Sequence, residues 1–202
     1  MTRVKFCGLR REEDIATANA LMPDDVGFVF AAKSKRCLTP EAARALKAQL
    51  APAIRAVGVL VDMPVRDAAA LVNSGIVDVL QLHGHEDEDY IQRLRALTLA
   101  PIIQAFAVRS VADLARAEAS SADIILLDAA RAGSGETFDW NLLAQVRRPY
   151  YLAGGLNLDN IATAVRTLHP YAVDVSSGIE TDGCKDAEKM AAFIQIVRSN
   201  AS

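Results

Sequence analysis

The sequence predicts a single (β/α)8 barrel. Short apolar runs rich in β-branched residues alternate with longer amphipathic stretches along the whole chain, and about eight such pairs can be counted. Alternating strand and helix patterns are typical of a parallel sheet with right-handed crossovers, and eight of them fit a closed barrel. The 202 residues, 51% of them hydrophobic, suffice for one sizeable core, and no linker divides residues 1–202 into domains.

A doubly wound open sheet is the structural alternative, and the chain is at the short end for a barrel. The open sheet is disfavoured because no G-x-G-x-x-G pattern follows the first predicted strand.

The predicted strands are short runs followed by turn-forming residues. In chain order they are Val4–Phe6, Val26–Phe30, Ala56–Val61, Val77–Leu82, Ile102–Ala107, Ile124–Leu127, Tyr150–Ala153 and Ala172–Val175.

The predicted helices occupy the amphipathic stretches between the strands. They are Glu12–Leu21, Pro40–Leu50, Arg66–Asn73, Glu88–Leu97, Val111–Ala119, Trp140–Val146, Asp159–Leu168 and Asp186–Arg198. Two starts carry a recognisable signal: Thr39 is an N-cap followed by proline, and Asn157 or Asp159 is expected to cap the seventh helix.

Composition and charge exclude several classes of protein. The net charge of −3 leaves no basic face for a nucleic acid, and no run of 18 apolar residues indicates a membrane span. No signal peptide is expected at the N-terminus. The three cysteines (Cys7, Cys37 and Cys184) form neither a disulfide framework nor a zinc motif. A reducing cytoplasm is therefore the expected compartment.

Strand alternation predicts which side chains point into the barrel. In the first strand Val4 and Phe6 share the face that packs on helices, which turns Lys5 and Cys7 inward. By the same argument Gln81, His83, Asp174 and Ser176 point inward from the fourth and eighth strands. A purely structural interior would hold layers of aliphatic residues, so these polar groups indicate a functional mouth.

Cys7 ends the first strand and is either a small core residue or a thiol that must ionise. A free thiol has a pKa of about 8.5, so a base at neutral pH needs help to form the thiolate. Lys5 lies two residues earlier on the same face, roughly 6–7 Å away, and its charge would favour the anion. We expect Asp174, on the strand next to the first in a closed barrel, to pair with Lys5.

Asp128 ends the sixth strand, in the catalytic rim of a barrel, and a glycine-bearing loop over residues 129–137 follows it. Alone, it could equally be an aspartate that caps its own loop.

The turns after the seventh and eighth strands, Ala153–Asn157 and Ser176–Glu180, contain glycines where barrels place phosphate sites. Glycine lets backbone N–H groups approach an anion closely. A single Gly-Gly is a weak signal, but two such turns at matching places predict a phosphate site.

Two further groups are less specific. The Lys33–Arg36 cluster follows the second strand; Arg36 could hold a carboxylate, although a solvated basic loop is the commoner role of such a cluster. His83 could be an acid or base, although a lone histidine is more often a hydrogen-bonding residue. Cys37 and Cys184 are assigned no role.

Together these motifs resemble the phosphoribosylanthranilate isomerases, which carry out an Amadori rearrangement in tryptophan synthesis. The resemblance covers nearly the whole chain and rests on an ordered set: Lys5–Gly8, Gly27–Phe30, Lys33–Arg36, Gln81–Gly84, Leu126–Asp128, Gly133–Trp140, Leu152–Leu156 and Val173–Glu180.

The resemblance implies a (β/α)8 isomerase with Cys7 as general base and Asp128 as general acid. It also implies a phosphorylated small-molecule substrate and needs no nicotinamide, flavin or metal. Residues implied or placed to bind the substrate are Arg36, His83, Gly154, Gly155, Asp174, Ser177 and Gly178. A monomer and a homodimer are both compatible with the sequence.

The chain departs from the common pattern at Phe6, at Lys35, where a proline is usual, and at Cys37, where an aromatic residue is usual. Two alternatives remain at this point. Another phosphosugar barrel, such as an epimerase or the related histidine-pathway isomerase, would use metal-dependent or paired-aspartate chemistry, and Cys7 disfavours the paired-aspartate type. A non-catalytic phosphosugar-binding barrel would need neither Cys7 nor Asp128.

Overall fold

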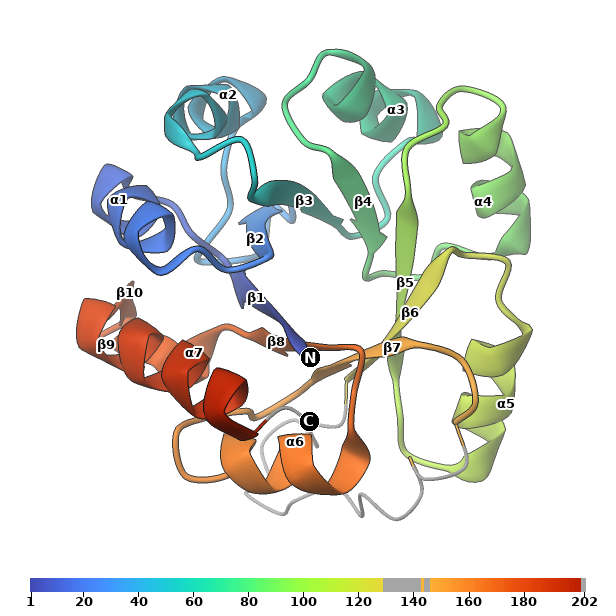
Figure 1. Cartoon of the computed structure of the whole chain (residues 1–202). Helices are drawn as coiled ribbons and strands as arrows, with labels where there is room; N and C mark the ends of the chain where they lie inside the picture. Colours follow the sequence, from blue (N-terminus) through green and yellow to red (C-terminus); the bar gives the residue numbers. More distant parts are fainter. Residues whose placement is uncertain (129–142, 144–145, 201–202) are drawn as a thin grey trace.

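The chain folds as a closed barrel of eight parallel strands ringed by helices (Figure 1). The computed structural model describes residues 1–128, 143 and 146–200. The strands pair in sequence order, and β1 closes the barrel against β8. They are β1 (Arg3–Cys7), β2 (Asp25–Val29), β3 (Arg55–Leu60), β4 (Val79–Leu82), β5 (Ile102–Ala107), β6 (Ile124–Asp128), β7 (Tyr150–Ala153) and β8 (Ala172–Val175).

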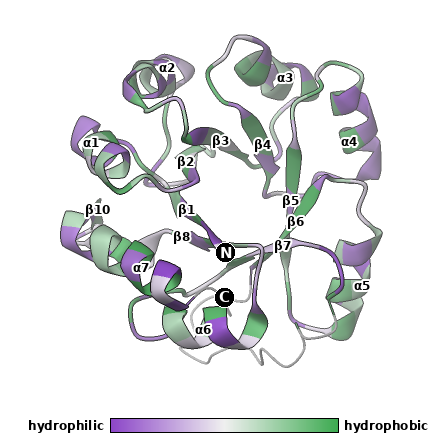
Figure 2. Ribbon diagram, in the orientation of Figure 1, coloured by the Kyte–Doolittle hydropathy of each residue, from purple (hydrophilic) through white to green (hydrophobic). Residues whose placement is uncertain are grey.

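Helices cover the outside of the barrel and bury their apolar stripes against it. They are α1 (Glu12–Leu21), α2 (Pro40–Gln49), α3 (Val65–Asn73), α4 (Glu88–Arg95), α5 (Val111–Ala119), α6 (Ile161–Leu168) and α7 (Ala187–Asn200). In α4, for example, Tyr90, Ile91 and Leu94 are buried, while Glu88 and Asp89 face solvent. Figure 2 shows this mixture of hydrophobic and hydrophilic residues on α4.

All eight predicted strands and seven of the predicted helices are confirmed, with boundaries that move by up to two residues. The helix expected over Trp140–Val146, and the loop over residues 129–137 with the Gly133–Trp140 motif, lie outside the described residues apart from Leu143 and Val146. Thr39 is the N-cap of α2 as expected, because its hydroxyl accepts a hydrogen bond from the Ala42 N–H.

The expected cap of the seventh predicted helix is wrong. That helix, α6, begins at Ile161 with Asn160 at the N-cap position. Asn157 instead accepts hydrogen bonds from the N–H groups of Asp159 and Asn160, at 2.9 and 3.2 Å. An asparagine that satisfies backbone donors two and three residues later forms a turn of its own, and this turn delays the start of the helix.

The barrel interior is divided between apolar packing and polar groups. A cluster of buried aliphatic and aromatic side chains from β3 to β8 fills part of it: Val57, Val79, Ile103, Leu126, Tyr151, Ala153 and Ala172. Below them Asp25 is fully buried and is bound by Arg55 at 2.7 Å and by the hydroxyl of Tyr151 at 2.7 Å. Burial and the charge of Asp25 raise the pKa of Tyr151 far above its usual range, which keeps this hydroxyl a donor.

After β8 the chain makes a short 3-10 helix over Ser177–Ile179 and then a small hairpin, β9 (Glu180–Thr181) and β10 (Cys184–Lys185). The hairpin precedes α7 and, through Glu180, reaches Arg36 in the loop after β2. None of the helices in the described part of the chain is long and apolar enough to cross a membrane.

Candidate active site

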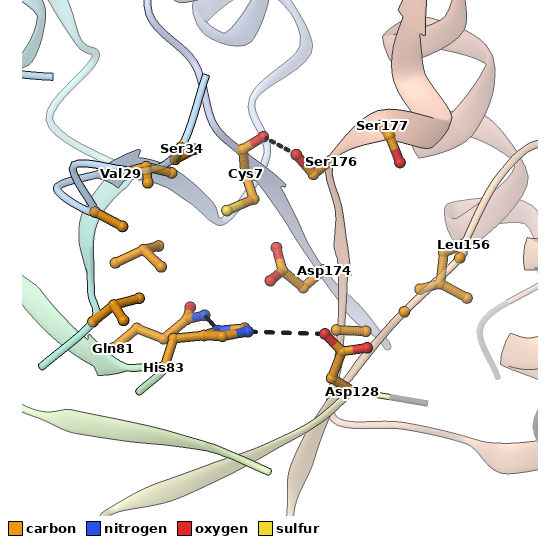
Figure 3. A pocket seen from close by; sticks show the side chains of 16 residues that line it. Cys7, Val29, Ser34, Gln81, His83, Asp128, Leu156, Asp174, Ser176 and Ser177 are labelled. Carbon is orange, nitrogen blue, oxygen red and sulfur yellow. Dashed lines mark hydrogen bonds and ion pairs between the residues drawn. The ribbon is translucent and has the colours of Figure 1, made fainter. Parts of the chain in front are cut away.

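A cavity of about 370 Å³ opens at the carboxyl ends of the strands (Figure 3). Its walls combine aliphatic side chains of β2 and β3 with polar groups from β1, β4, β6 and β8 and with the turns after β7 and β8. The sequence-predicted residues that line it are Cys7, His83, Asp128, Gly154, Gly155, Asp174 and Ser177. Seven of the nine predicted site residues therefore meet in one cavity, although they come from five strands and their turns.

Cys7 reaches this cavity because its neighbour on β2 has no side chain. Gly27 pairs with Cys7, and a Cβ atom at Gly27 would lie 2.8 Å from the sulfur. The thiol is only partly buried and stands at the end of its strand, above the buried Lys5. Strand alternation thus placed both side chains correctly.

The predicted pairing of Lys5 with Asp174 is confirmed. Lys5 Nζ lies 3.0 Å from Asp174 Oδ2, and the lysine side chain is fully buried. Burial alone would lower the pKa of Lys5, but the carboxylate of Asp174 outweighs it and raises the pKa. Lys5 is therefore a fixed positive charge beneath the thiol.

The net effect on Cys7 differs from the sequence expectation. Burial raises the pKa of the thiol and is the largest influence, Asp174 adds to it, and Lys5 and Lys185 oppose it. Lys5 does favour the thiolate, as expected, but it does not overcome burial. The resting thiol is therefore protonated at neutral pH, and the thiolate is a minor form.

Asp128, His83 and Gln81 form a line of polar groups on the opposite side of the cavity from Cys7 (Figure 3). Gln81 Nε2 lies 2.9 Å from His83 Nδ1, and His83 Nε2 lies 3.8 Å from Asp128 Oδ2. With the amide nitrogen donating to Nδ1, the neutral imidazole carries its proton on Nε2, the atom nearer Asp128. The imidazole is thereby oriented toward the carboxyl group.

The two glycine turns meet at one end of the cavity. Gly154 and Gly155 have positive φ angles of 93° and 64°, which glycine adopts without strain. Gly178 stands behind the cavity wall, where any Cβ atom would collide with the carbonyl of Leu156. The turn after β8 can therefore pack against the turn after β7 only with glycine at 178, and this contact holds the backbones of the two turns side by side.

Arg36 lies at the rim and not in the wall of the cavity. Its guanidinium donates two hydrogen bonds to Glu180, at 2.7 Å to Oε1 and 2.6 Å to Oε2. Burial of Glu180 raises its pKa, but hydrogen bonds from Arg36 and Lys185 outweigh this and lower the pKa to about 2. Glu180 and Lys185 were missed at the sequence level. Glu180 is the last residue of the predicted glycine turn Ser176–Glu180, and this position was the one available signal.

In the described ranges, no group of three or more histidine, cysteine, aspartate or glutamate side chains is arranged to hold a metal ion. A closed parallel barrel whose cavity, at the carboxyl ends of the strands, is lined by a thiol, a carboxyl group, an imidazole and two glycine turns has the architecture of the (β/α)8 enzymes.

Comparison with known proteins narrows this class to one family. A family model described as N-(5'phosphoribosyl)anthranilate (PRA) isomerase matches residues 4–196. The N-(5'-phosphoribosyl)anthranilate isomerase of Endomicrobium trichonymphae is 43% identical over 203 residues, which span 98% of this chain and all of the relative. The namesake from Thermoanaerobacter sp. is 44% identical over 204 residues and 98% of both chains.

Solved structures agree. The phosphoribosyl anthranilate isomerase of Thermotoga maritima superposes with a TM-score of 0.91 at 36% identity, over 98% of this chain and 100% of that one. A phosphoribosyl anthranilate isomerase in complex with reduced 1-(o-carboxyphenylamino)-1-deoxyribulose 5-phosphate superposes with a TM-score of 0.88 at 34% sequence identity, with the same coverage of both chains. The chain belongs to the N-(5'-phosphoribosyl)anthranilate isomerase family.

Proposed function

We propose that the chain converts N-(5-phosphoribosyl)anthranilate to 1-(2-carboxyphenylamino)-1-deoxyribulose 5-phosphate, the third step of tryptophan synthesis from chorismate. The observation that carries this proposal is the placement of Cys7 and Asp128 on opposite walls of one cavity that ends in two glycine turns. Acid and base can then act on different atoms of one bound sugar phosphate. Family membership supports the same reaction.

Asp128 is the proposed general acid. Its proton goes to the furanose ring oxygen, the bond from that oxygen to C1' breaks, and the anthranilate nitrogen forms a protonated imine with C1'. His83 Nε2, at 3.8 Å from Asp128 Oδ2, is close enough to hold this carboxyl group in place or to contact the released hydroxyl.

Cys7 is the proposed general base. The cationic imine makes the proton on C2' acidic, and the thiolate removes it to leave an enolamine. The enolamine then takes a proton at C1' and loses the proton of its C2' hydroxyl, which gives the ketone. The two electrons of the C2'–H bond stay within the substrate, so the reaction is balanced without an external oxidant or reductant.

The substrate's other groups have matching partners. Backbone around Gly154 and Gly155 and around Ser177 and Gly178 is proposed to hold the phosphate. Asp174 lines the cavity, and its Oδ1 atom is buried without a hydrogen-bond partner among the described residues. This oxygen is therefore suited to accept a hydrogen bond from a sugar hydroxyl. Arg36 is proposed to bind the anthranilate carboxylate.

We further propose that residues 1–202 act as one catalytic domain, as a monomer or a homodimer, in the cytoplasm. All three cysteines, each within the described ranges, are free thiols, which suits a reducing compartment. One related structure is of monomers generated from the dimeric phosphoribosylanthranilate isomerase of Thermotoga maritima.

The direct test is consumption of freshly made N-(5-phosphoribosyl)anthranilate, followed by loss of its fluorescence with the purified chain. We expect turnover with kcat/KM of at least about 10⁴ M⁻¹s⁻¹, the lower bound typical of enzymes on their own substrates. Absence of turnover in a folded preparation would refute the proposed reaction.

The pH dependence should reflect the raised pKa of Cys7. A base is active when deprotonated, and burial moves the ionisation of this thiol above its ordinary value. The pH dependence of kcat/KM reports ionisations of the free enzyme. We therefore expect kcat/KM to rise with pH, with the midpoint of the rise above the ordinary pKa of a thiol. The rate at which iodoacetamide alkylates Cys7, read by peptide mass spectrometry, should rise over the same range. An alkylation midpoint below the ordinary thiol pKa of about 8.5 would contradict the direction of the shift.

A further inference from the structure

The guanidinium of Arg36 is held by a carboxylate that the proposed reaction does not use. Glu180 accepts hydrogen bonds from one edge of the guanidinium, from Nε to Oε1 at 2.7 Å and from Nη2 to Oε2 at 2.6 Å. The Glu180 side chain is only 8% exposed. A guanidinium has five donors in a rigid plane, and a second edge lies between Nη1 and Nη2. Among the residues that the structure describes, none accepts a hydrogen bond from Nη1.

Lys185 keeps this carboxylate from neutralising Arg36. Its Nζ lies 2.6 Å from Glu180 Oε1, and its side chain is 2% exposed. Two cations therefore share one anion, and the three groups together carry a charge of +1. This residual charge remains available to attract an anionic group at the rim of the cavity.

The same lysine connects the rim to the strand that carries Cys7. Lys185 Nζ donates to the backbone carbonyl of Ser176 at 2.9 Å, and the Ser176 hydroxyl donates to the carbonyl of Cys7 at 3.1 Å (Figure 3). Arg36 is thus linked to Cys7 by a chain of partly buried hydrogen bonds that runs through Glu180, Lys185 and Ser176.

The stem of Arg36 is fixed from the other side by the turn after β1. A Cβ atom at Gly8 would collide with Cδ of Arg36, so the arginine chain lies directly on the glycine backbone. With its stem on Gly8 and its head on Glu180, the guanidinium has little rotational freedom. Preorganisation of this kind reduces the entropy lost when a ligand binds.

We propose that Glu180, with Lys185 as its counter-ion, is a positioning residue that aims the second edge of Arg36 at the carboxylate of the anthranilate ring. This inference rests on the proposed function and adds to it a source of specificity for an aromatic carboxylate. Glu180 touches no reacting atom. Its effect is on the binding of one end of the substrate.

The test compares wild type with Glu180→Gln, which keeps the shape of the side chain and removes its charge. Anthranilate and inorganic phosphate serve as competitive inhibitors that probe the two ends of the site. We expect the Ki of anthranilate and the KM to rise about tenfold or more, because the loss of the charged hydrogen bonds that orient Arg36 outweighs the extra positive charge that the variant leaves at the rim. The Ki of phosphate and kcat should change by less than about threefold, since neither depends on that bond.

Two variants make the result decisive. Glu188→Gln makes the same change on an exposed residue of α7, and we expect all four constants to match wild type. Glu180→Asp keeps the charge, but its side chain is too short to accept from both Nε and Nη2 of Arg36. If Glu180→Gln does not fold, Glu180→Asp should show the same result, weaker anthranilate inhibition with unchanged phosphate inhibition. Unchanged anthranilate inhibition, or an equal loss for anthranilate and phosphate, would overturn the proposal. Wild-type turnover tests the proposed reaction separately.

Discussion

Replacing Cys7 with alanine is expected to lower kcat by about 10² to 10⁴-fold, the usual contribution of a positioned general base. KM should change little, because the thiol removes a proton and is not proposed to anchor either charged end of the substrate. The measurement is steady-state turnover of N-(5-phosphoribosyl)anthranilate by fluorescence. Cys7→Ala removes one sulfur atom from a partly buried position and should leave a folded protein.

The other two cysteines provide matched controls. Cys37 is exposed in the loop after β2, and Cys184 lies on the β10 hairpin, so alanine at either should leave kcat unchanged. Cys7→Ser separates size from ionisation, because a hydroxyl fits the space but does not ionise in the accessible pH range. A kcat for Cys7→Ala within about threefold of wild type would remove Cys7 from the role of base, given the magnitude expected for such a group.

The raised pKa of Cys7 affects how this thiol would act as the proposed base. In the resting enzyme burial holds the proton on sulfur, although Lys5 and Lys185 oppose it. The substrate contributes a further positive charge when the ring opens to the protonated imine. A cation next to the thiol favours the thiolate. The base is therefore expected to become effective at the step that needs it, and the thiol remains largely protonated before that.

Much of this site could be predicted from the sequence because a strand has a period of two. Once Val4 and Phe6 are assigned to the helix-facing side, Lys5 and Cys7 have to point inward. Closure of eight strands then brings β8 next to β1, which places Asp174 beside Lys5. These inferences need only local alternation and the order of strands.

The contacts of Arg36 could not be predicted in this way. Glu180 and Lys185 lie on a hairpin whose existence depends on a two-residue turn, and Glu180 meets Arg36 across 144 positions of sequence. The direction of the Cys7 pKa was equally inaccessible, since it is a balance between burial and charges on β1, β8 and β10. Such balances depend on three-dimensional distances that a pattern of residues does not contain.

Asp128→Asn is expected to lower kcat by about 10² to 10⁴-fold, because an amide fits the same space but has no acidic proton to give the ring oxygen. His83 makes this prediction specific, since its Nε2 lies 3.8 Å from Asp128 Oδ2 and could itself be the acid. We expect the fold-decrease in kcat to be at least ten times smaller for His83→Asn than for Asp128→Asn, because His83→Asn removes an orienting group but leaves the acid in place. Asp89→Asn, on the exposed face of α4, is the matched control and should behave as wild type. A larger loss for His83→Asn would transfer the acid role to the histidine, with Asp128 then serving to orient its ring.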